Sequence, residues 1–308
     1  MTRYPPPLRK GDLIALIAPS SPLGPDRPVE EIARRVEALG FRVRIGDSCR
    51  RETACGYAAA PAEVRAGDIN AAFADPEVRA VWCVRGGSTA WQLPPLLNYA
   101  AMSRDPKPFI GFSDVTTLHL AIGGRCGLAT YHGPMAGSLL EPDVKFDPFT
   151  QKSFFRTLGE WDCLPAENPP EEPAEVLRPG RAAGRLVGGN LSLVAASLGT
   201  PWQVDARDAV LFLEDVGEEV YALDRMLSQL RYAGVFASAA AVVLGTFTGC
   251  GNQYRADYGP RELMADFFRD CSKPVLYGVK SGHCTPMLTL PLGAVCRIDG
   301  ERLWFTRK

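Results

Sequence analysis

The stretch 107-KPFIGFSDVTTLHLAI-122 joins an apolar run to a helix-like run, with Ser113 at the junction. Residues 107–112 are typical of a buried strand, and the residues after Ser113 predict a helix. A serine at this point is a good helix N-cap. It can also be a nucleophile at a strand-to-helix turn, where the helix N-terminus would stabilise a developing oxyanion. The local sequence does not choose between these two interpretations.

The same alternation of strands and helices extends over the first 140 residues. Alternating β and α units with nearly continuous apolar strands predict a parallel sheet that is covered on both faces by helices. We therefore expect residues 1–140 to form a flavodoxin-like or Rossmann-like domain, with functional residues at the carboxyl ends of its strands. The expected strands are 12–18, 41–46, 79–84, 107–112 and 128–133, and the expected helices are 28–40, 61–76 and 114–124.

The character of the chain changes after residue 140. Residues 141–184 are rich in Pro, Glu and Ala and predict a linker with irregular structure. Residues 185–308 predict a second, smaller domain that is β-rich and mixed in type, with a glycine-rich turn near its start. Its expected strands are 209–215, 239–247, 274–279 and 293–299, and its expected helix is 221–234. The predicted fold class is α/β, with two domains and a cleft between them.

Composition limits the classes of function. The 308 residues are 46% hydrophobic and 22% charged, and the net charge of −1 indicates no basic surface for nucleic acid or for an anionic membrane. The expected partner is a small molecule or a peptide. No apolar run is long enough to span a bilayer, and no secretory signal is recognisable. Nine cysteines without a C-x-x-C pair favour a reducing compartment, so we expect a cytoplasmic protein.

Several common catalytic motifs are absent from the sequence. It contains no G-x-x-x-x-G-K-[ST], no H-E-x-x-H, and no G-x-G-x-x-G between a strand and a helix. Hydrolysis of nucleoside triphosphates, zinc-protease chemistry and a dinucleotide cofactor therefore lack their simplest support. The run G-F-S-D-V also differs from the G-x-S-x-G elbow of α/β-hydrolases, because Val115 stands where the second glycine belongs. A standard α/β-hydrolase is disfavoured.

A nucleophilic serine needs a base, and the chain contains three histidines. His119 lies six residues after Ser113, so on a helix it faces away from the serine. His132 stands at a strand end and can line a pocket. His283 lies in a loop rich in Gly, Ser and Pro between two strand-like runs, and such loops often carry catalytic groups. A solvated loop histidine is the alternative for His283.

The base in turn needs a carboxylate that orients it. Glu214 ends the apolar run AVLFLE, so its carboxylate is expected at a strand end, and Asp215 points to the opposite face by strand alternation. The alternative is that this acidic pair solvates a loop.

A glycine pair in 84-VRGGST-89 follows another strand, and its amides can serve an oxyanion. Ser88 is a rival nucleophile there. Arg85 can anchor a substrate carboxylate or form a surface ion pair.

The combination and chain order of these motifs resemble one family. The chain is similar to the LD-carboxypeptidases, the serine peptidase family S66 of muramoyltetrapeptide carboxypeptidases, which also contains microcin C self-immunity proteins. The blocks that carry the resemblance run nearly from end to end: GDLIALIAPSSP, VRGG, PFIGFSDVTTLHLA, GRLVGGNLSLVAASLGTPW, LFLEDVGEEVYALDRMLSQLR and SGHCTPMLTLPLG.

The resemblance implies roles for particular residues. It implies a Ser–His–Glu triad at Ser113, His283 and Glu214, and an oxyanion hole from the backbone amides of Gly87 and Asp114. It places Ser88 in the oxyanion loop, where Ser88 and Arg85 remain candidate substrate contacts. It also implies a homodimer, and no metal or organic cofactor.

The implied activity is removal of the terminal D-alanine from muramoyl tetrapeptides during peptidoglycan recycling. An immunity-type hydrolase of peptidyl or aminoacyl nucleotides and a non-catalytic binding protein are the alternatives. The family continues its double glycine with Tyr-Gly and a later arginine, where this chain has Ser88, Thr89 and Gln92. Val220 also replaces a common proline. These departures leave side-chain recognition of the substrate open.

Overall fold

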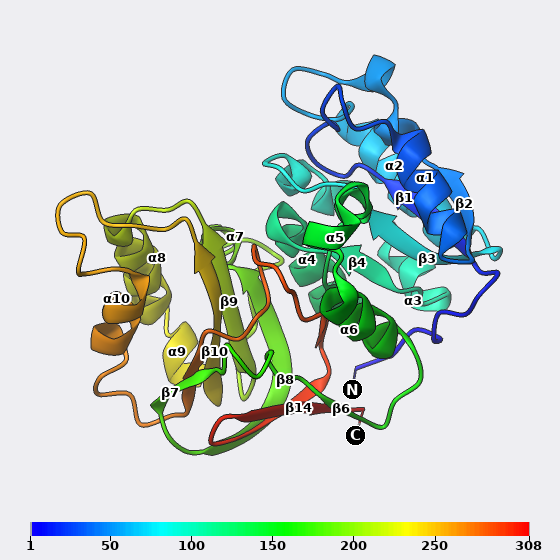
Figure 1. Ribbon diagram of the computed structural model, residues 1–308. Coiled ribbons are helices and arrows are strands. Elements are labelled where there is room, and N and C mark those ends of the chain that lie inside the picture. The colour runs from blue at the N-terminus through cyan, green and yellow to red at the C-terminus, as the bar shows by residue number, and fades with distance from the viewer. Residues whose placement is uncertain (1, 308) are drawn as a thin grey trace.

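The first sheet of the computed structural model, which describes residues 2–307, has the strand order β12-β5-β4-β3-β1-β2 (Figure 1). Its first five strands in the chain pair in parallel, and β12 pairs antiparallel with β5 at one edge. The order 2-1-3-4-5 is that of flavodoxin-like domains, so this part of the fold prediction is confirmed. The strands are β1 (Leu13–Ile17), β2 (Arg42–Ile45), β3 (Val78–Cys83), β4 (Phe109–Gly111), β5 (Thr130–His132) and β12 (Leu290–Leu292).

Helices cover both faces of this sheet because its strands are apolar on both sides. In β1, Leu13, Ala15 and Ile17 face one core, whereas Ile14 and Leu16 face the other. One core is closed by α2 (Ala62–Ala74), α3 (Tyr99–Arg104) and α4 (Thr116–Cys126), and the other by α1 (Val29–Ala38) and α6 (Pro148–Leu158).

The second sheet is mixed, with the order β6-β14-β13-β8-β9-β10-β11-β7. Strands β8 to β11 are parallel, and the outer pairings are antiparallel. The strands are β6 (Cys163–Pro165), β7 (Glu175–Arg178), β8 (Arg181–Asn190), β9 (Val210–Val216), β10 (Ala241–Thr248), β11 (Val275–Tyr277), β13 (Val295–Asp299) and β14 (Arg302–Thr306). The helices of this domain are α7 (Leu191–Ala196), α8 (Val220–Tyr232), α9 (Val235–Ser238) and α10 (Pro260–Phe267).

The segment 141–184 differs from the irregular linker that its composition predicts. It forms α5 (Pro142–Lys145) and α6, contributes β6 and β7 to the second sheet, and begins β8. Proline starts α6 without cost because Pro148 stands at the first helical position, after the Asp147 N-cap. The expected glycine-rich turn is likewise part of strand β8, which contains Gly184 and has Gly188 and Gly189 near its carboxyl end.

The chain crosses between the two domains more than once. After β11 it returns to the first sheet as β12 and then goes back to the second sheet as β13. His283 lies on the segment that makes this return, between β11 and β12, and Figure 1 shows this segment running between the two domains. Short 3₁₀ helices lie within several connections: η1 (Asp47–Cys49), η2 (Arg51–Thr53), η3 (Ala90–Gln92), η4 (Pro94–Leu96), η5 (Ser113–Val115) and η6 (Ala136–Leu140). None of the helices in the described part of the chain has the length and hydrophobicity needed to cross a bilayer.

Candidate active site

Ser113 lies on a strained turn between β4 and α4. Its φ is +61°, and Asp208 is the only other non-glycine residue in 2–307 with a positive φ. Such a backbone conformation costs roughly 1–3 kcal/mol for an L-residue. The Ser113 hydroxyl caps no backbone N–H of the following helix and instead lies 3.0 Å from Nε2 of His283. The structure therefore does not place Ser113 as an N-cap.

His283 connects Ser113 to Glu214. The Nδ1 atom of His283 lies 2.8 Å from Oε2 of Glu214, and the backbone N–H of His283 donates to the same oxygen at 3.2 Å. An ionised carboxylate only accepts, so Nδ1 carries the proton and Nε2 is free to accept the proton of the Ser113 hydroxyl. Gly282 allows this approach: at its φ of +119°, a Cβ atom would lie 2.5 Å from Oε2 of Glu214. The three predicted side chains thus form one hydrogen-bonded chain.

Burial dominates the electrostatics of Glu214. Its side chain is fully buried in β9, and burial raises the pKa of this carboxyl above its ordinary value. The hydrogen bond from His283 opposes that shift. Within residues 2–307, Oε1 of Glu214 has no hydrogen-bond partner. The hydrogen bond from His283 therefore offsets part of the free-energy cost of burying the Glu214 carboxylate. The charged form of Glu214 thus depends on its contact with His283.

The amides of Gly87 and Asp114 are unengaged. Asp114 follows Ser113 in the chain, and Gly86, next to Gly87, packs against Ser113, since a Cβ atom on Gly86 would lie 3.2 Å from Cβ of Ser113. Neither N–H donates a hydrogen bond to any acceptor in the described residues. Gly87 has a φ of +148°, and a Cβ atom there would lie 2.1 Å from Oγ of Ser21, so only glycine fits this approach to the loop after β1. Free N–H groups next to a serine hydroxyl can receive an oxyanion.

The Asp114 side chain holds the loop that carries Gly87. Its Oδ2 accepts from the Ser20 hydroxyl at 2.5 Å and from the Ala90 N–H at 2.8 Å, and Oγ of Ser20 accepts from the Thr89 N–H at 3.1 Å. Asp114 is 2% exposed. Asp114 therefore has a free backbone N–H directly after Ser113, and its carboxylate fixes the loop that carries Gly87.

A buried guanidinium completes this arrangement. Arg65 of α2 donates to the carbonyl oxygens of Ala60, Pro19 and Thr89 at 2.7–2.9 Å, and also to the side chain of Gln92. Burial lowers the pKa of Arg65, and the Asp114 charge opposes that shift. Residues 89 and 92, where the chain departs from the family it resembles, are thus held by an arginine from a helix.

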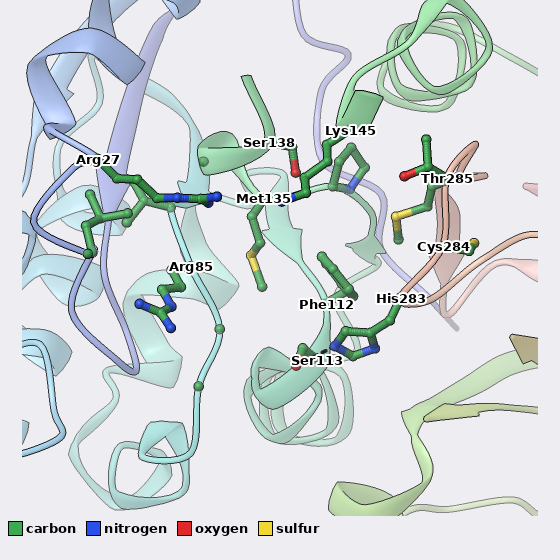
Figure 2. Close-up of a pocket in the computed structure, with 18 of the residues that line it drawn as sticks. Arg27, Arg85, Phe112, Ser113, Met135, Ser138, Lys145, His283, Cys284 and Thr285 are labelled. Atoms are coloured by element: carbon green, nitrogen blue, oxygen red, sulfur yellow. Dashed lines mark hydrogen bonds between the residues drawn. The ribbon is translucent and has the colours of Figure 1, made fainter. Parts of the chain in front are cut away.

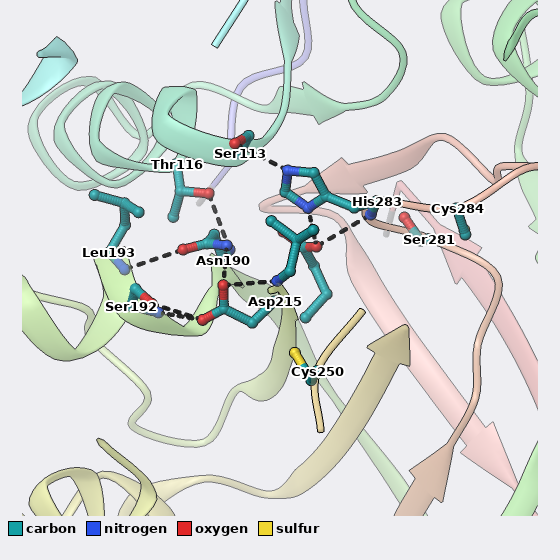
Figure 3. Close-up of polar contacts among 12 residues, drawn as sticks. Ser113, Thr116, Asn190, Ser192, Leu193, Asp215, Cys250, Ser281, His283 and Cys284 are labelled. Carbon is teal, nitrogen blue, oxygen red and sulfur yellow. Dashed lines mark hydrogen bonds and ion pairs between the residues drawn. The ribbon is translucent and has the colours of Figure 1, made fainter. Parts of the chain in front are cut away.

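A second network ties the Ser113 turn to the other domain (Figure 3). Thr116 Oγ1 accepts from the backbone N–H of Asn190 at 3.0 Å, and Nδ2 of Asn190 donates to Oδ1 of Asp215 at 2.8 Å. The Ser192 N–H and hydroxyl donate to Oδ2 of Asp215 at 2.9 and 2.7 Å. Asp215 is 2% exposed, so the acidic pair at 214–215 does not solvate a loop.

Ser113 and His283 open into a cavity of about 860 Å³ (Figure 2). Arg85 lines this cavity, and its guanidinium donates to the Pro22 carbonyl at 2.7 Å. Ser88 is exposed and does not line it. The lining residues are Leu23, Gly24, Arg27, Val84, Arg85, Gly86, Gly87, Phe112, Ser113, Pro134, Met135, Gly137, Ser138, Lys145, Thr248, His283, Cys284, Thr285 and Met287.

The other two histidines lie apart from this chemistry. Nε2 of His119 donates to the Gly111 carbonyl at 2.9 Å, and burial lowers the His119 pKa to about 4. His132 is fully buried and does not line the cavity, and burial lowers its pKa well below the ordinary value. Both rings are therefore neutral core groups. In residues 2–307, no three His, Cys, Asp or Glu side chains are grouped as metal ligands would be.

Sequence reasoning did not anticipate Ser20, Arg65 and Asn190 as residues of the site, nor the bonds that the side chain of Asp215 makes there. Ser20 follows a predicted strand within 18-APSSP-22, which marks it as a residue at the carboxyl edge of the sheet. Asn190 precedes a short helix and accepts from the Leu193 N–H, as an N-cap does. Arg65 gives no local signal, because an arginine on an amphipathic helix is usually solvated.

Comparisons with known proteins agree on one family. The model of the LD-carboxypeptidase N-terminal domain matches residues 14–133, and that of the LD-carboxypeptidase C-terminal domain matches residues 183–298. A probable murein peptide carboxypeptidase of Bacillus subtilis is 36% identical over 294 residues, which are 94% of this chain and 89% of the relative.

Solved structures that resemble nearly the whole chain include two of differently named proteins. The microcin C7 self-immunity protein MccF, in an inactive mutant apo state, superimposes with a TM-score of 0.91 at 25% identity, covering 99% of this chain and 98% of that chain. A muramoyltetrapeptide carboxypeptidase from Oxalobacter formigenes superimposes with a TM-score of 0.80 at 28% identity, covering 95% and 97%.

Proposed function

The chain belongs to the LD-carboxypeptidase family of peptidases, and on this premise we propose that it is a serine peptidase that releases the terminal D-alanine of muramoyl tetrapeptides. The observation that carries the proposal is the hydrogen-bonded chain from Ser113 through His283 to Glu214. The muramoyltetrapeptide carboxypeptidase among the similar structures supports the choice of substrate.

The proposed first step is attack of Ser113 on the scissile carbonyl. Nε2 of His283 takes the serine proton as the Oγ–C bond forms, and Glu214 stabilises the imidazolium through Nδ1–H. The positive φ of Ser113 holds its hydroxyl at the carboxyl edge of the sheet, in front of the N-terminus of α4. The negative oxygen of the tetrahedral intermediate then accepts from the N–H groups of Gly87 and Asp114.

The proposed second half returns the enzyme to its starting state. His283 gives its proton to the nitrogen of the leaving D-alanine, and the C–N bond breaks to leave an acyl-enzyme on Ser113. Water then enters, His283 takes a proton from it, and the acyl group leaves as a carboxylate while the serine regains its proton. The half-buried position of His283, with 19% of its side chain exposed, suits both solvent entry and proton transfer.

The proposed setting is the cytoplasm, in peptidoglycan recycling, with a homodimer as the assembly. All nine cysteines are free thiols, which supports a reducing compartment. The dimer rests on the family resemblance.

A second candidate is a hydrolase of peptidyl or aminoacyl nucleotides, which the likeness to MccF favours. A nucleobase is commonly held by stacking on an aromatic side chain. Among the described residues Phe112 is the only Phe, Tyr or Trp in the cavity lining, and its ring lies against His283 with a centroid distance of 4.8 Å. We therefore favour the peptide substrate.

The test is incubation with a muramoyl tetrapeptide and measurement of free D-alanine. We expect release by the wild-type protein and its loss in Ser113→Ala, with Ser88→Ala as the matched control that retains activity. Cleavage of aminoacyl adenylates without release of D-alanine would establish the second candidate. A folded protein that turns over neither substrate would be a binding protein.

A further inference from the structure

The cavity beside Ser113 has a positively charged wall that the proposed steps do not use. Arg27 follows β1, and Lys145 ends α5. Figure 2 shows both side chains on the opposite side of the cavity from Ser113 and His283. Arg85 is a third cation in the lining. Their position points to a part of the substrate that lies away from the reacting carbonyl.

One carboxylate shows how Arg27 and Lys145 are spaced. Glu141 accepts through its Oε1 atom both from a guanidinium nitrogen of Arg27 and from Nζ of Lys145, the latter at 2.8 Å. A single carboxylate oxygen thus reaches both cations. Most of their donors remain available, because a guanidinium has five N–H bonds and an ammonium has three.

The charge of the cavity is not balanced. Its lining within residues 2–307 contains Arg27, Arg85 and Lys145 and no Asp or Glu. Glu141 compensates one of these charges, and Arg85 interacts with a neutral carbonyl. A cavity with uncompensated cations attracts and orients an anionic ligand.

Fold stability does not account for this cluster. The side chains of Arg27, Glu141 and Lys145 are 42%, 36% and 42% exposed. Ion pairs with such exposure stabilise a protein very little, since solvent screens them and ordering the side chains costs entropy. Cations that converge on a cavity at little benefit to stability are suited to bind a ligand.

We propose that Arg27 and Lys145 form a subsite for a substrate carboxylate remote from the scissile bond. This inference rests on the proposed peptidase function and names the substrate class as an acidic oligopeptide. The incoming carboxylate takes the bridging position that Glu141 now occupies or binds beside it. The volume of about 860 Å³ lies in the upper part of the usual range of about 300–1,000 Å³ for small-molecule sites, so a peptide of several residues can span from Ser113 to this wall.

The experiment compares two muramoyl tetrapeptides with the same free terminal D-alanine carboxylate. In one peptide the internal carboxylates are free, and in the other they are amidated. Release of D-alanine by the wild-type protein gives kcat and KM, and calorimetry on Ser113→Ala gives the Kd without turnover. We expect a preference of about 10- to 100-fold for the free carboxylates, because charge-assisted pairs are the strong hydrogen bonds.

The variant Arg27→Gln/Lys145→Met should reduce that preference to within about threefold. The reduction should come from a higher KM for the peptide with free carboxylates, with kcat nearly unchanged. The matched control is Arg104→Gln/Lys152→Met, which removes the same two charges from exposed positions outside this cavity. Glu141→Gln should act in the opposite direction and increase the preference, because it frees both cations.

Equal use of both peptides by the wild-type protein would overturn the subsite, as would an equal loss in the control variant or a reduced preference in Glu141→Gln. If Arg27→Gln/Lys145→Met does not fold, the result for Glu141→Gln decides. The measurements distinguish a failure of the subsite from a failure of the proposed peptidase function. Charge-dependent binding to Ser113→Ala without D-alanine release by the wild-type protein would refute the peptidase function and retain the subsite.

Discussion

The two sides of the Ser113 turn are held in different ways. Asp114, directly after the serine, is bound within its own domain to Ser20 and to the N–H of Ala90. Thr116, two residues later, is bound across the domain boundary to Asn190. The first contact sets the distance between the turn and the loop with Gly87. The second places the turn relative to the strand that carries Glu214.

This difference separates two geometric requirements of the proposed reaction. The oxyanion hole is built inside one domain and depends on the Asp114 side. The alignment of serine with histidine is built between domains and depends on the Asn190 side. Breaking the Asp114 side and breaking the Asn190 side should therefore impair different steps of the reaction.

Asp114→Ala breaks the side within the domain. It removes the acceptor for Ser20 and Ala90, so the loop that carries Gly87 loses its direct bond to the Ser113 turn. We expect kcat for D-alanine release to fall by about 10²- to 10³-fold, the usual effect of losing one oxyanion donor, with KM nearly unchanged. Asp114→Asn, which keeps an oxygen in the same place, should retain more activity than the alanine variant. A KM that rises by the same factor as kcat falls would argue against a role of Asp114 in the oxyanion hole.

Asn190→Ala loosens the side between the domains indirectly, because the backbone N–H of residue 190 still donates to Thr116. The variant removes the amide that donates to Asp215 and the cap of α7, so the end of β8 that holds the turn is attached less firmly to β9. We expect a loss of about 10- to 100-fold in the rate of Ser113 acylation by a fluorophosphonate, because small misplacements of reacting groups are costly.

The same variant should lower the free energy of unfolding by about 1–3 kcal/mol, since the buried Asp215 carboxylate loses one of its hydrogen-bond donors. Ser192→Ala keeps the backbone bond to Asp215 and should show a smaller effect in both measurements. An Asn190→Ala protein that is acylated at the wild-type rate would show that the domains are aligned by other contacts.

Glu214→Gln tests the buried charge of Glu214, which lies next to Asp215 in the network between the domains. Burial raises the pKa of Glu214 above its ordinary value of 4.5. A raised carboxyl pKa means that stability is fully present below the ordinary value and is lost as the pH rises through the folded value. Relative to Glu214→Gln, the wild-type protein should therefore lose Tm as the pH rises from the ordinary carboxyl pKa of 4.5 through the raised pKa of the folded state. A difference in Tm that does not change with pH would contradict this electrostatic account.

Much of the N-terminal domain could be predicted from the sequence, because its signals are local. The apolar run at 13–17 and the amphipathic helix at 29–38 lie where the pattern predicts them. Strand β12 could not be predicted in the same way. Its residues Leu290–Leu292 include a proline and pair with β5, about 160 residues earlier in the chain, so no local period reports their position.

In the site, too, local features could be predicted from the sequence, whereas contacts between distant residues could not. The junction at Ser113 is visible in the sequence, but its positive φ is not, because a serine before a helix also suits an N-cap. For Asp114, the family resemblance implied that its backbone amide serves the oxyanion hole. It did not report that the carboxylate accepts from Ser20 and Ala90, because these residues lie in other loops. For the pair at 214–215, the sequence left a solvated loop as an alternative, and the bond from Asn190 to the buried Asp215 excludes it.

The proposed reaction requires Ser113 to be a nucleophile that His283 activates. The direct measurement is treatment of the folded protein with a fluorophosphonate, followed by peptide mass spectrometry to locate the adduct. The account predicts a single adduct on Ser113 in the wild-type protein, and acylation slower by about 10²-fold or more in His283→Ala, which lacks the general base. An adduct on another serine, or an unmodified Ser113 in folded wild-type protein, would contradict it.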